Sequence, residues 1–170
     1  MAKWNGKTRK LFLITAFAGV LLHFLYQLLP SLPIALITPV NESIWEHVKL
    51  LFWPFLVAAL WGSRKEGFGN LAAWLAALLT ICGLMLAVGW AAHVMLGIGS
   101  LAFDVALYFI LLALGFWLAS RWQAVTGHGK IWFGLTALLL LAIWWFTFSP
   151  PDTALFADPA LADAWYQLPC

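Results

Sequence analysis

The run LAAWLAALLTICGLMLAVGWAAHVML, residues 71–96, contains no Asp, Glu, Lys or Arg and decides the fold class of this chain. A helix rises about 1.5 Å per residue, so the run is long enough to cross the roughly 30 Å hydrocarbon core of a bilayer. Four further apolar runs have a similar length, at residues 11–29, 39–61, 101–120 and 131–148. We therefore predict an all-α, polytopic membrane protein: a bundle of five transmembrane helices over residues 1–148, followed by a tail at 149–170.

The composition excludes other classes of protein. Hydrophobic residues make up 64% of the chain and charged residues 9%, whereas a soluble domain has about 25% charged residues. The chain has too few polar side chains to cover a water-soluble surface and is too apolar to be disordered. Its nine Lys and Arg residues are scattered, so we expect membrane lipid and no nucleic acid as a partner. A homodimer stays open as an alternative.

The distribution of positive charge predicts the orientation. Basic residues precede the first run and follow the second and fourth runs, whereas the loops after the first and third runs and the tail have none; the eight residues are Lys3, Lys7, Arg9, Lys10, Arg64, Lys65, Arg121 and Lys130. Cytoplasmic loops carry the excess of Lys and Arg. We predict that the N-terminus lies inside and the C-terminus outside. The first run is longer than a signal-peptide core, so we interpret it as a retained anchor.

The ionisable side chains inside the predicted helices gather in the halves that would face outward. They come from four of the five runs: His23, Glu42, Glu46, His47, Lys49, His93 and Asp104. The inner halves are almost wholly apolar. Ionisable residues are expensive within a membrane, and they commonly line the bundle interior or a functional pathway.

The motif TPVNESIWEHVK, residues 38–49, carries most of these groups. Thr38 is a suitable N-cap with Pro39 at the first helical position. At about 100° per residue, a helix starting there would have a polar arc of about 160°, which must face the bundle interior or a water-filled cavity. Glu46 and Lys49 are neighbours at i and i+3. His47 would lie about 140–160° from Glu42 and Lys49, so one site would not easily use all three.

These residues have candidate roles that follow from their chemistry. We predict catalytic roles for Glu46, Lys49 and Glu42, and binding roles for Asn41, Tyr26 and Trp45. Histidine and carboxylate ligands suit Zn²⁺ or another divalent metal, and the candidate ligands are His23, His47, Asp104 and His93. The chain has no H-E-x-x-H or G-x-S-x-G motif. The metal prediction therefore rests only on the similar predicted depth of these side chains in the membrane. The alternative is that Glu46 and Lys49 form a purely structural buried ion pair.

The chain resembles a family of small bacterial membrane proteins classed as a domain of unknown function. The resemblance rests on PVNESIWEHVK at residues 39–49, HFLY at 23–26, Gly97, Gly99 and Asp104, and PP with LFADP at 150–159. It spans nearly the whole chain, although the residues after 159 depart from the ending of that family. It implies a multi-pass protein of the bacterial inner (plasma) membrane and assigns no activity.

Three functions stay open from the sequence. The first is a metal-dependent intramembrane hydrolase of a lipid-like substrate, with its polar site open to the outer leaflet. The second is a protein that binds or transports an ion, a proton or a small solute through the Glu42, Glu46 and Lys49 network. The third is an accessory or structural membrane protein in which the polar residues only specify helix packing.

Overall fold

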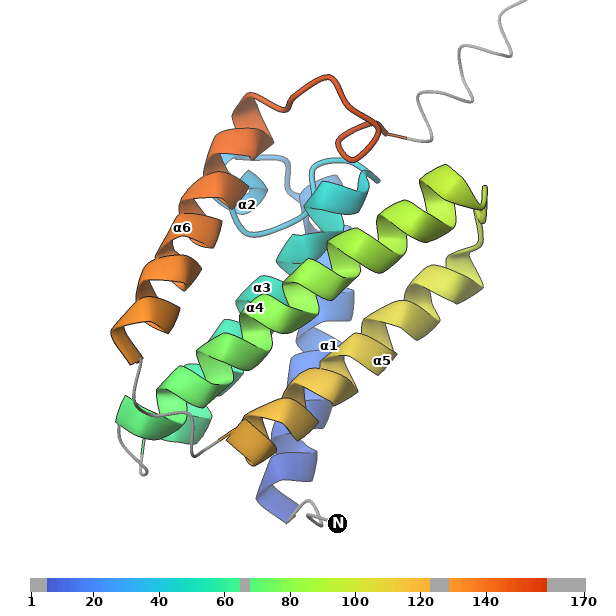
Figure 1. The fold of residues 1–170 in the computed structure, drawn as a ribbon. Helices are drawn as coiled ribbons and strands as arrows, with labels where there is room; N and C mark the ends of the chain where they lie inside the picture. Colours follow the sequence, from blue (N-terminus) through green and yellow to red (C-terminus); the bar gives the residue numbers. More distant parts are fainter. Residues whose placement is uncertain (1–5, 65–67, 123–128, 159–170) are drawn as a thin grey trace, which may run out of the picture.

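The computed structural model describes residues 6–64, 68–122 and 129–158 of the chain. Its elements are α1 (Gly6–Leu28), α2 (Leu32–Ala35), α3 (Ile44–Ser63), α4 (Phe68–Trp90), the π-helix η1 (Ala91–Met95), α5 (Leu101–Arg121) and α6 (Gly129–Phe148) (Figure 1). Five helical stretches are long and apolar enough to cross a membrane, and they correspond to the five predicted runs. The prediction of an all-helical fold with five such spans is confirmed.

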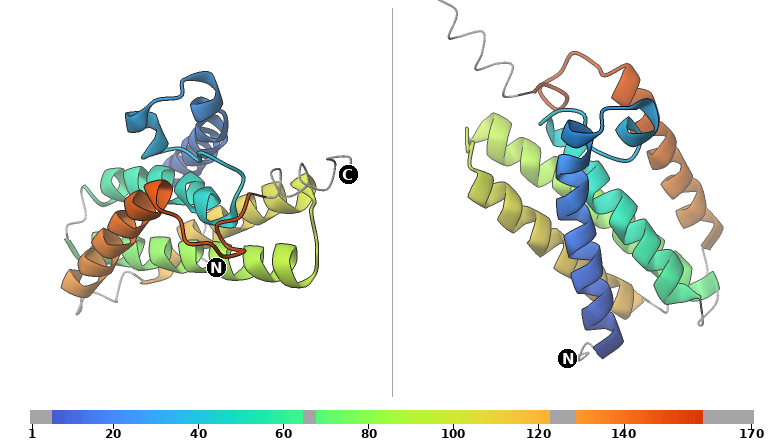
Figure 2. Two further views of the ribbon diagram at one scale, coloured as in Figure 1. Left: turned by 90° about the horizontal axis from the view of Figure 1, so that it is seen from above. Right: turned by 180° about the vertical axis from the view of Figure 1, so that it is seen from behind.

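Helices α3 and α4 occupy the middle of the bundle. Helix α4 packs against α3, α5 and α6, while α1 crosses behind α3 and also contacts α5 (Figures 1 and 2). The core between these helices is built from large apolar side chains that are fully buried: Phe52, Phe55, Leu78, Ile81, Leu112 and Phe116. Gly115 of α5 allows close approach, because a Cβ there would lie 2.7 Å from the Phe55 ring.

The outer faces of α1 and α6 are apolar and exposed. Leu13 and Phe17 of α1 are each 64% exposed, and Leu138 of α6 is 63% exposed. A soluble monomer rarely presents such continuous apolar faces to water. These surfaces suit contact with lipid, which agrees with the length and composition of the helices.

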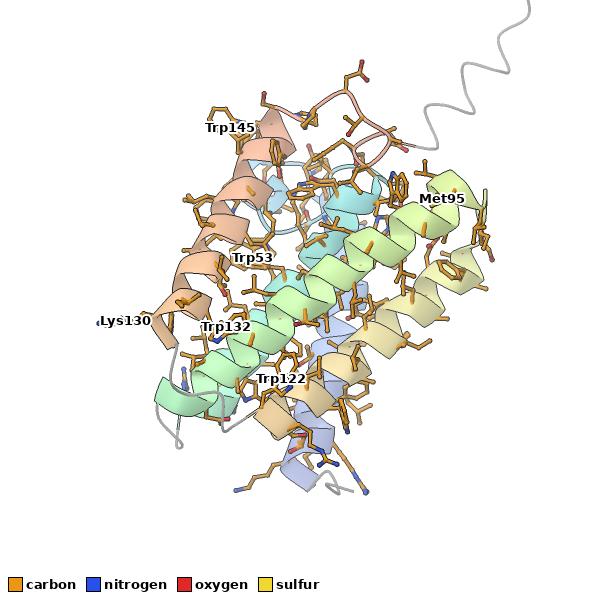
Figure 3. The ribbon with its side chains drawn as sticks, in the orientation of Figure 1. Trp53, Met95, Trp122, Lys130, Trp132 and Trp145 are labelled. Carbon is orange, nitrogen blue, oxygen red and sulfur yellow. The ribbon has the colours of Figure 1, made fainter. Side chains whose placement is uncertain are left out.

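Charge is separated between the two ends of the bundle. The described Lys and Arg residues other than Lys49 lie near the α1 start, the α3 and α5 ends and the α6 start. In Figure 3, Lys130 marks that end of α6 and Trp145 lies near the opposite end. Lys3, Lys65 and the tail after residue 158 lie outside the described residues. The separation agrees with the charge rule, and the direction of the chain across a membrane stays a prediction.

Helix α3 begins at Ile44, so the predicted start at Pro39 with Thr38 as N-cap is wrong. The N-cap is Ser43, whose hydroxyl accepts a hydrogen bond from the Glu46 backbone N–H at 3.3 Å. Asn41 Oδ1 accepts from the Ser43 N–H at 3.0 Å, which closes an Asx turn before the helix. Residues 29–43 instead fold back over the end of the bundle, with α2 as a single helical turn (Figures 1 and 2).

Candidate metal centre

The seven ionisable residues of the predicted site lie at the end of the bundle that carries α2, and they divide into three groups. Glu46 pairs with Lys49, Asp104 pairs with His93, and the third group comprises His23, Glu42 and His47. Within the part of the chain that the structure describes, this third group is the one cluster of three side chains whose ligand atoms all lie within 4.8 Å of one another.

The Glu46–Lys49 pair is buried, as predicted from their spacing. Lys49 Nζ donates to Glu46 Oε2 at 2.6 Å, and the Lys49 and Glu46 side chains are 0% and 3% exposed, respectively. Lys49 Nζ also donates to the carbonyl oxygens of Ala35 at 2.8 Å and Thr38 at 3.2 Å. An ammonium group has three N–H donors, and here each one has an acceptor.

This pair holds the segment that precedes α3. The carbonyls of Ala35 and Thr38 lie at and just after the end of α2, where helical carbonyls lack intrahelical partners. Glu46 Oε2 also accepts from the Val40 N–H at 2.9 Å. The pair therefore links α3 to both sides of the turn at residues 35–40. Its contacts support a positioning role, and the catalytic roles of Glu46 and Lys49 stay predictions.

The third group brings two imidazoles to one carboxylate. His47 Nε2 lies 3.5 Å from Glu42 Oε2, and His23 Nε2 lies 3.9 Å from Glu42 Oε1. The two rings are tilted against each other with centroids 5.6 Å apart. Both histidines are half-buried, whereas the Glu42 side chain is 44% exposed. The cluster is thus anchored on the helices and open on the side of Glu42.

The hydrogen bond on the far side of the His47 ring fixes its tautomer. His47 Nδ1 lies 2.8 Å from the Ser43 carbonyl oxygen, and a carbonyl oxygen only accepts, so Nδ1 carries the hydrogen. In the neutral ring, Nε2 then presents a lone pair toward the Glu42 carboxylate. Two electron-rich atoms repel each other unless a cation lies between them. A proton or a metal ion satisfies this arrangement.

The donor set matches that of catalytic zinc sites. Such sites have three protein ligands, among them the His₂Glu combination, and a fourth position for water or substrate. A ligating histidine usually donates its other ring N–H to a carbonyl or a carboxylate, as His47 does toward Ser43. A His₂-carboxylate set also suits Fe²⁺. The side chains of His23, Glu42 and His47 can therefore hold one divalent cation.

The sequence prediction that His47 and Glu42 lie on different sides of one helix is wrong. It assumed a helix from Pro39, whereas Glu42 precedes the Ser43 N-cap and has no helical register. The Asx turn at Asn41 directs this short non-helical stretch back toward the first turn of α3. The predicted separation of His47 from Lys49 agrees with their placement in different groups.

The four predicted metal ligands do not form one cluster. His93 Nε2 lies 2.7 Å from Asp104 Oδ1, so these two residues pair with each other across η1 and α5. Asp104 lies in the first turn of α5 and His93 lies within the π-helix. Glu42, predicted as catalytic, takes the place of His93 and Asp104 beside the other two histidines.

The predicted binding residues have distinct surroundings. The Asn41 amide closes the turn before α3. Trp45 is buried, and its ring packs against Phe146 of α6 and Phe156 of the tail. Tyr26 of α1 lines a cavity of about 380 Å³ between the α1 end, the α2 region and the α6 end. Binding by these three residues stays a prediction.

Sequence reasoning missed the fold-back segment, residues 29–43, and the cavity that Tyr26 lines. The signals were present: Ser43-Ile44-Trp45-Glu46 fits the Ser-x-x-Glu capping pattern. Ser31 followed by Pro33 likewise fits the start of a short helix. Both signals lay inside or beside apolar runs, where hydropathy favours a continuous span.

Comparison with known proteins identifies the family of this chain, and that family has no assigned activity. Neither the curated proteins nor the solved structures include a match to this chain. The model of one family, described as a family of unknown function (DUF6512), matches residues 2–164. The match covers nearly the whole chain and every residue of the candidate metal centre, so this protein belongs to the DUF6512 family.

Proposed function

We propose that this protein is a metal-dependent hydrolase of a lipid-like substrate, with a Zn²⁺ ion held by His23, Glu42 and His47. One observation carries the proposal. Two imidazole Nε2 atoms face one carboxylate at 3.5 and 3.9 Å, which is longer than a hydrogen bond. The Ser43 carbonyl fixes the tautomer of the His47 ring, so in the neutral ring the Nε2 lone pair points toward the carboxylate. A divalent cation between the three groups removes the repulsion.

The chemistry follows from a three-ligand zinc ion. Bound zinc lowers the pKa of its water to about 7, so hydroxide forms near neutral pH without a dedicated base. With His23, Glu42 and His47 holding the ion, the site would supply a nucleophilic water for ester hydrolysis, in which one product gains the hydroxyl group and the released alcohol gains the proton. The Glu42 side chain lies on the exposed side of the cluster, which leaves access for a substrate.

The packing beneath the site favours an enzyme over a transporter. The layer between the metal centre and the basic end contains Phe52, Phe55 and Phe116, each no more than 1% exposed. An ion or proton pathway needs polar groups or water along its length. The Glu46–Lys49 pair is buried and fully engaged at its own depth. These contacts support a local reaction site at one end of the bundle.

The proposal includes the setting of the protein. The charge distribution of the sequence supports a cytoplasmic location for the basic end, and we assign the chain to the bacterial plasma membrane. The metal centre then lies near the outer surface, within reach of outer-leaflet lipids.

A hydrolysis assay tests this function. The protein is purified in detergent and incubated in mixed micelles with a diacyl phospholipid or an isoprenyl diphosphate, and products are followed by mass spectrometry. We expect product from one of the two classes, loss of product with EDTA, and recovery with added Zn²⁺. Absence of product from both classes, or turnover that is unchanged by EDTA, would contradict the proposal.

Matched histidine variants locate the activity. His47→Ala removes one proposed ligand, so it should lower the rate at least a hundredfold. His93→Gln alters a histidine that is paired with a carboxylate elsewhere in the bundle, so it should retain most of the rate. Equal losses in both variants would indicate a general effect on folding rather than a metal centre at His47.

A further inference from the structure

The residues that line the cavity at Tyr26 indicate which kind of molecule it can bind. Its volume is about 380 Å³, within the usual range of ligand pockets of about 300–1,000 Å³. The lining residues are mostly apolar, and three of them carry a hydroxyl group: Tyr26, Ser31 and Thr147. No charged side chain lines it among the described residues. Such a cavity suits an uncharged, largely apolar group.

The cavity and the metal centre draw on neighbouring residues of the same two segments. Tyr26 lines the cavity, and it follows His23 by three residues on α1, so both side chains lie on one helix face. Val40 lines the cavity two residues before Glu42 and is held by its N–H bond to Glu46. The cavity lining and the metal ligands are therefore only two or three residues apart along both segments.

The mouth of the cavity indicates which molecules can enter it. Leu32 and Phe148 line the cavity and are 71% and 58% exposed, so the cavity mouth continues into the apolar outer surface. In a helical bundle that spans a membrane, this surface contacts lipid chains. The molecule with direct access to the cavity is a membrane lipid.

We propose that the cavity at Tyr26, Ser31, Val40 and Thr147 binds an acyl chain of a membrane phospholipid and directs its head-group linkage toward the metal centre. The inference rests on the proposed function for the role of the metal, whereas the acyl binding itself depends only on the cavity. It narrows the substrate class from lipid-like molecules in general to acyl-chain phospholipids.

The test measures binding of a monoacyl phospholipid, lysophosphatidylglycerol, to the full-length protein by native mass spectrometry. Ser31→Trp and Thr147→Phe add bulk from opposite walls of the cavity. Each should weaken binding at least tenfold. Ser149→Trp is the matched control, since Ser149 is exposed at the same end of the bundle and does not line the cavity; it should bind as the parent does.

Folding is checked for each variant by size-exclusion chromatography and thermal unfolding, and two cavity variants guard against the failure of one to fold. Non-saturable binding to the parent, or equal binding by both folded cavity variants and the parent, would overturn the proposal. A loss of binding in Ser149→Trp equal to that in the cavity variants would also overturn it.

A metal-free arm separates this inference from the proposed function. Binding is repeated after EDTA treatment and in His47→Ala. Retained saturable binding that stays sensitive to Ser31→Trp supports the acyl site even where no hydrolysis occurs. Loss of cavity-dependent binding in the parent with intact metal-dependent hydrolysis refutes the acyl site alone.

Discussion

Replacement of Lys49 by methionine tests the buried ion pair that anchors the fold-back segment. Methionine keeps a long apolar stem and removes the ammonium group. Three hydrogen bonds disappear, to Glu46 Oε2, the Ala35 carbonyl and the Thr38 carbonyl. Because Lys49 is fully buried, water does not replace the lost donors.

The structure gives the expected magnitude. Breaking a buried ion pair by removal of one partner destabilises a protein by about 3–5 kcal/mol. An equilibrium constant changes tenfold for about 1.4 kcal/mol, so the folded-to-unfolded ratio should fall more than a hundredfold. The double variant Glu46→Gln with Lys49→Met removes both charges. The carbonyls of Ala35 and Thr38 still lack a donor, at a cost of about 1–3 kcal/mol each. The double variant should therefore recover only part of the lost free energy of unfolding.

The assay is equilibrium unfolding with SDS in mixed micelles, followed by far-UV circular dichroism. Lys130→Met is the matched control, because Lys130 is exposed and surface substitutions usually change stability by no more than about 0.5 kcal/mol. A Lys49→Met protein within about 1 kcal/mol of the parent would refute the anchoring role. Full recovery in the double variant would show that the carbonyl contacts contribute nothing measurable.

Three further predictions follow from other contacts. Gly19→Ala should destabilise the bundle by about 1–3 kcal/mol, because a Cβ there would collide with the Tyr108 hydroxyl; Gly83→Ala, with open space around it, should be neutral or stabilising in the same unfolding assay. Asp104→Asn weakens a hydrogen bond to its imidazole partner and should lower stability by about 1–3 kcal/mol without changing the zinc content, and a loss of zinc would show that the two His–carboxylate groups are coupled. An impermeant thiol reagent should label Cys170 in intact cells, and protection until the membrane is opened would reverse the predicted orientation.

Hydropathy was sufficient to predict the five spans because each run has the length and apolar character that a bilayer requires. Helix α1 ends at Leu28, close to the end of the run at 11–29, but it starts at Gly6 and so includes the basic residues that precede the run. The positions of α4 and α5 agree with the runs at 71–96 and 101–120, apart from the π-helix at Ala91–Met95. A π-helix results from local packing and has no hydropathy signature.

The candidate site was only partly predictable, because its geometry depends on where α3 begins. The i, i+3 spacing correctly predicted the Glu46–Lys49 pair. The meeting of Glu42 with His47 depends on a non-helical turn at Asn41, and a helical projection places the two residues apart. The contribution of His23 from α1 is a tertiary contact, which the spacing within one helix does not contain.

The zinc content of the purified protein shows whether His23, Glu42 and His47 hold a metal ion. The protein is purified with a tag that does not bind metal, and zinc is measured by inductively coupled plasma mass spectrometry. We expect about one zinc per chain, the number that a single three-ligand site holds. The zinc should be lost in His23→Ala and in His47→Ala at unchanged helical content. A parent protein without bound metal, or folded alanine variants that keep the full zinc content, would contradict the proposed metal centre.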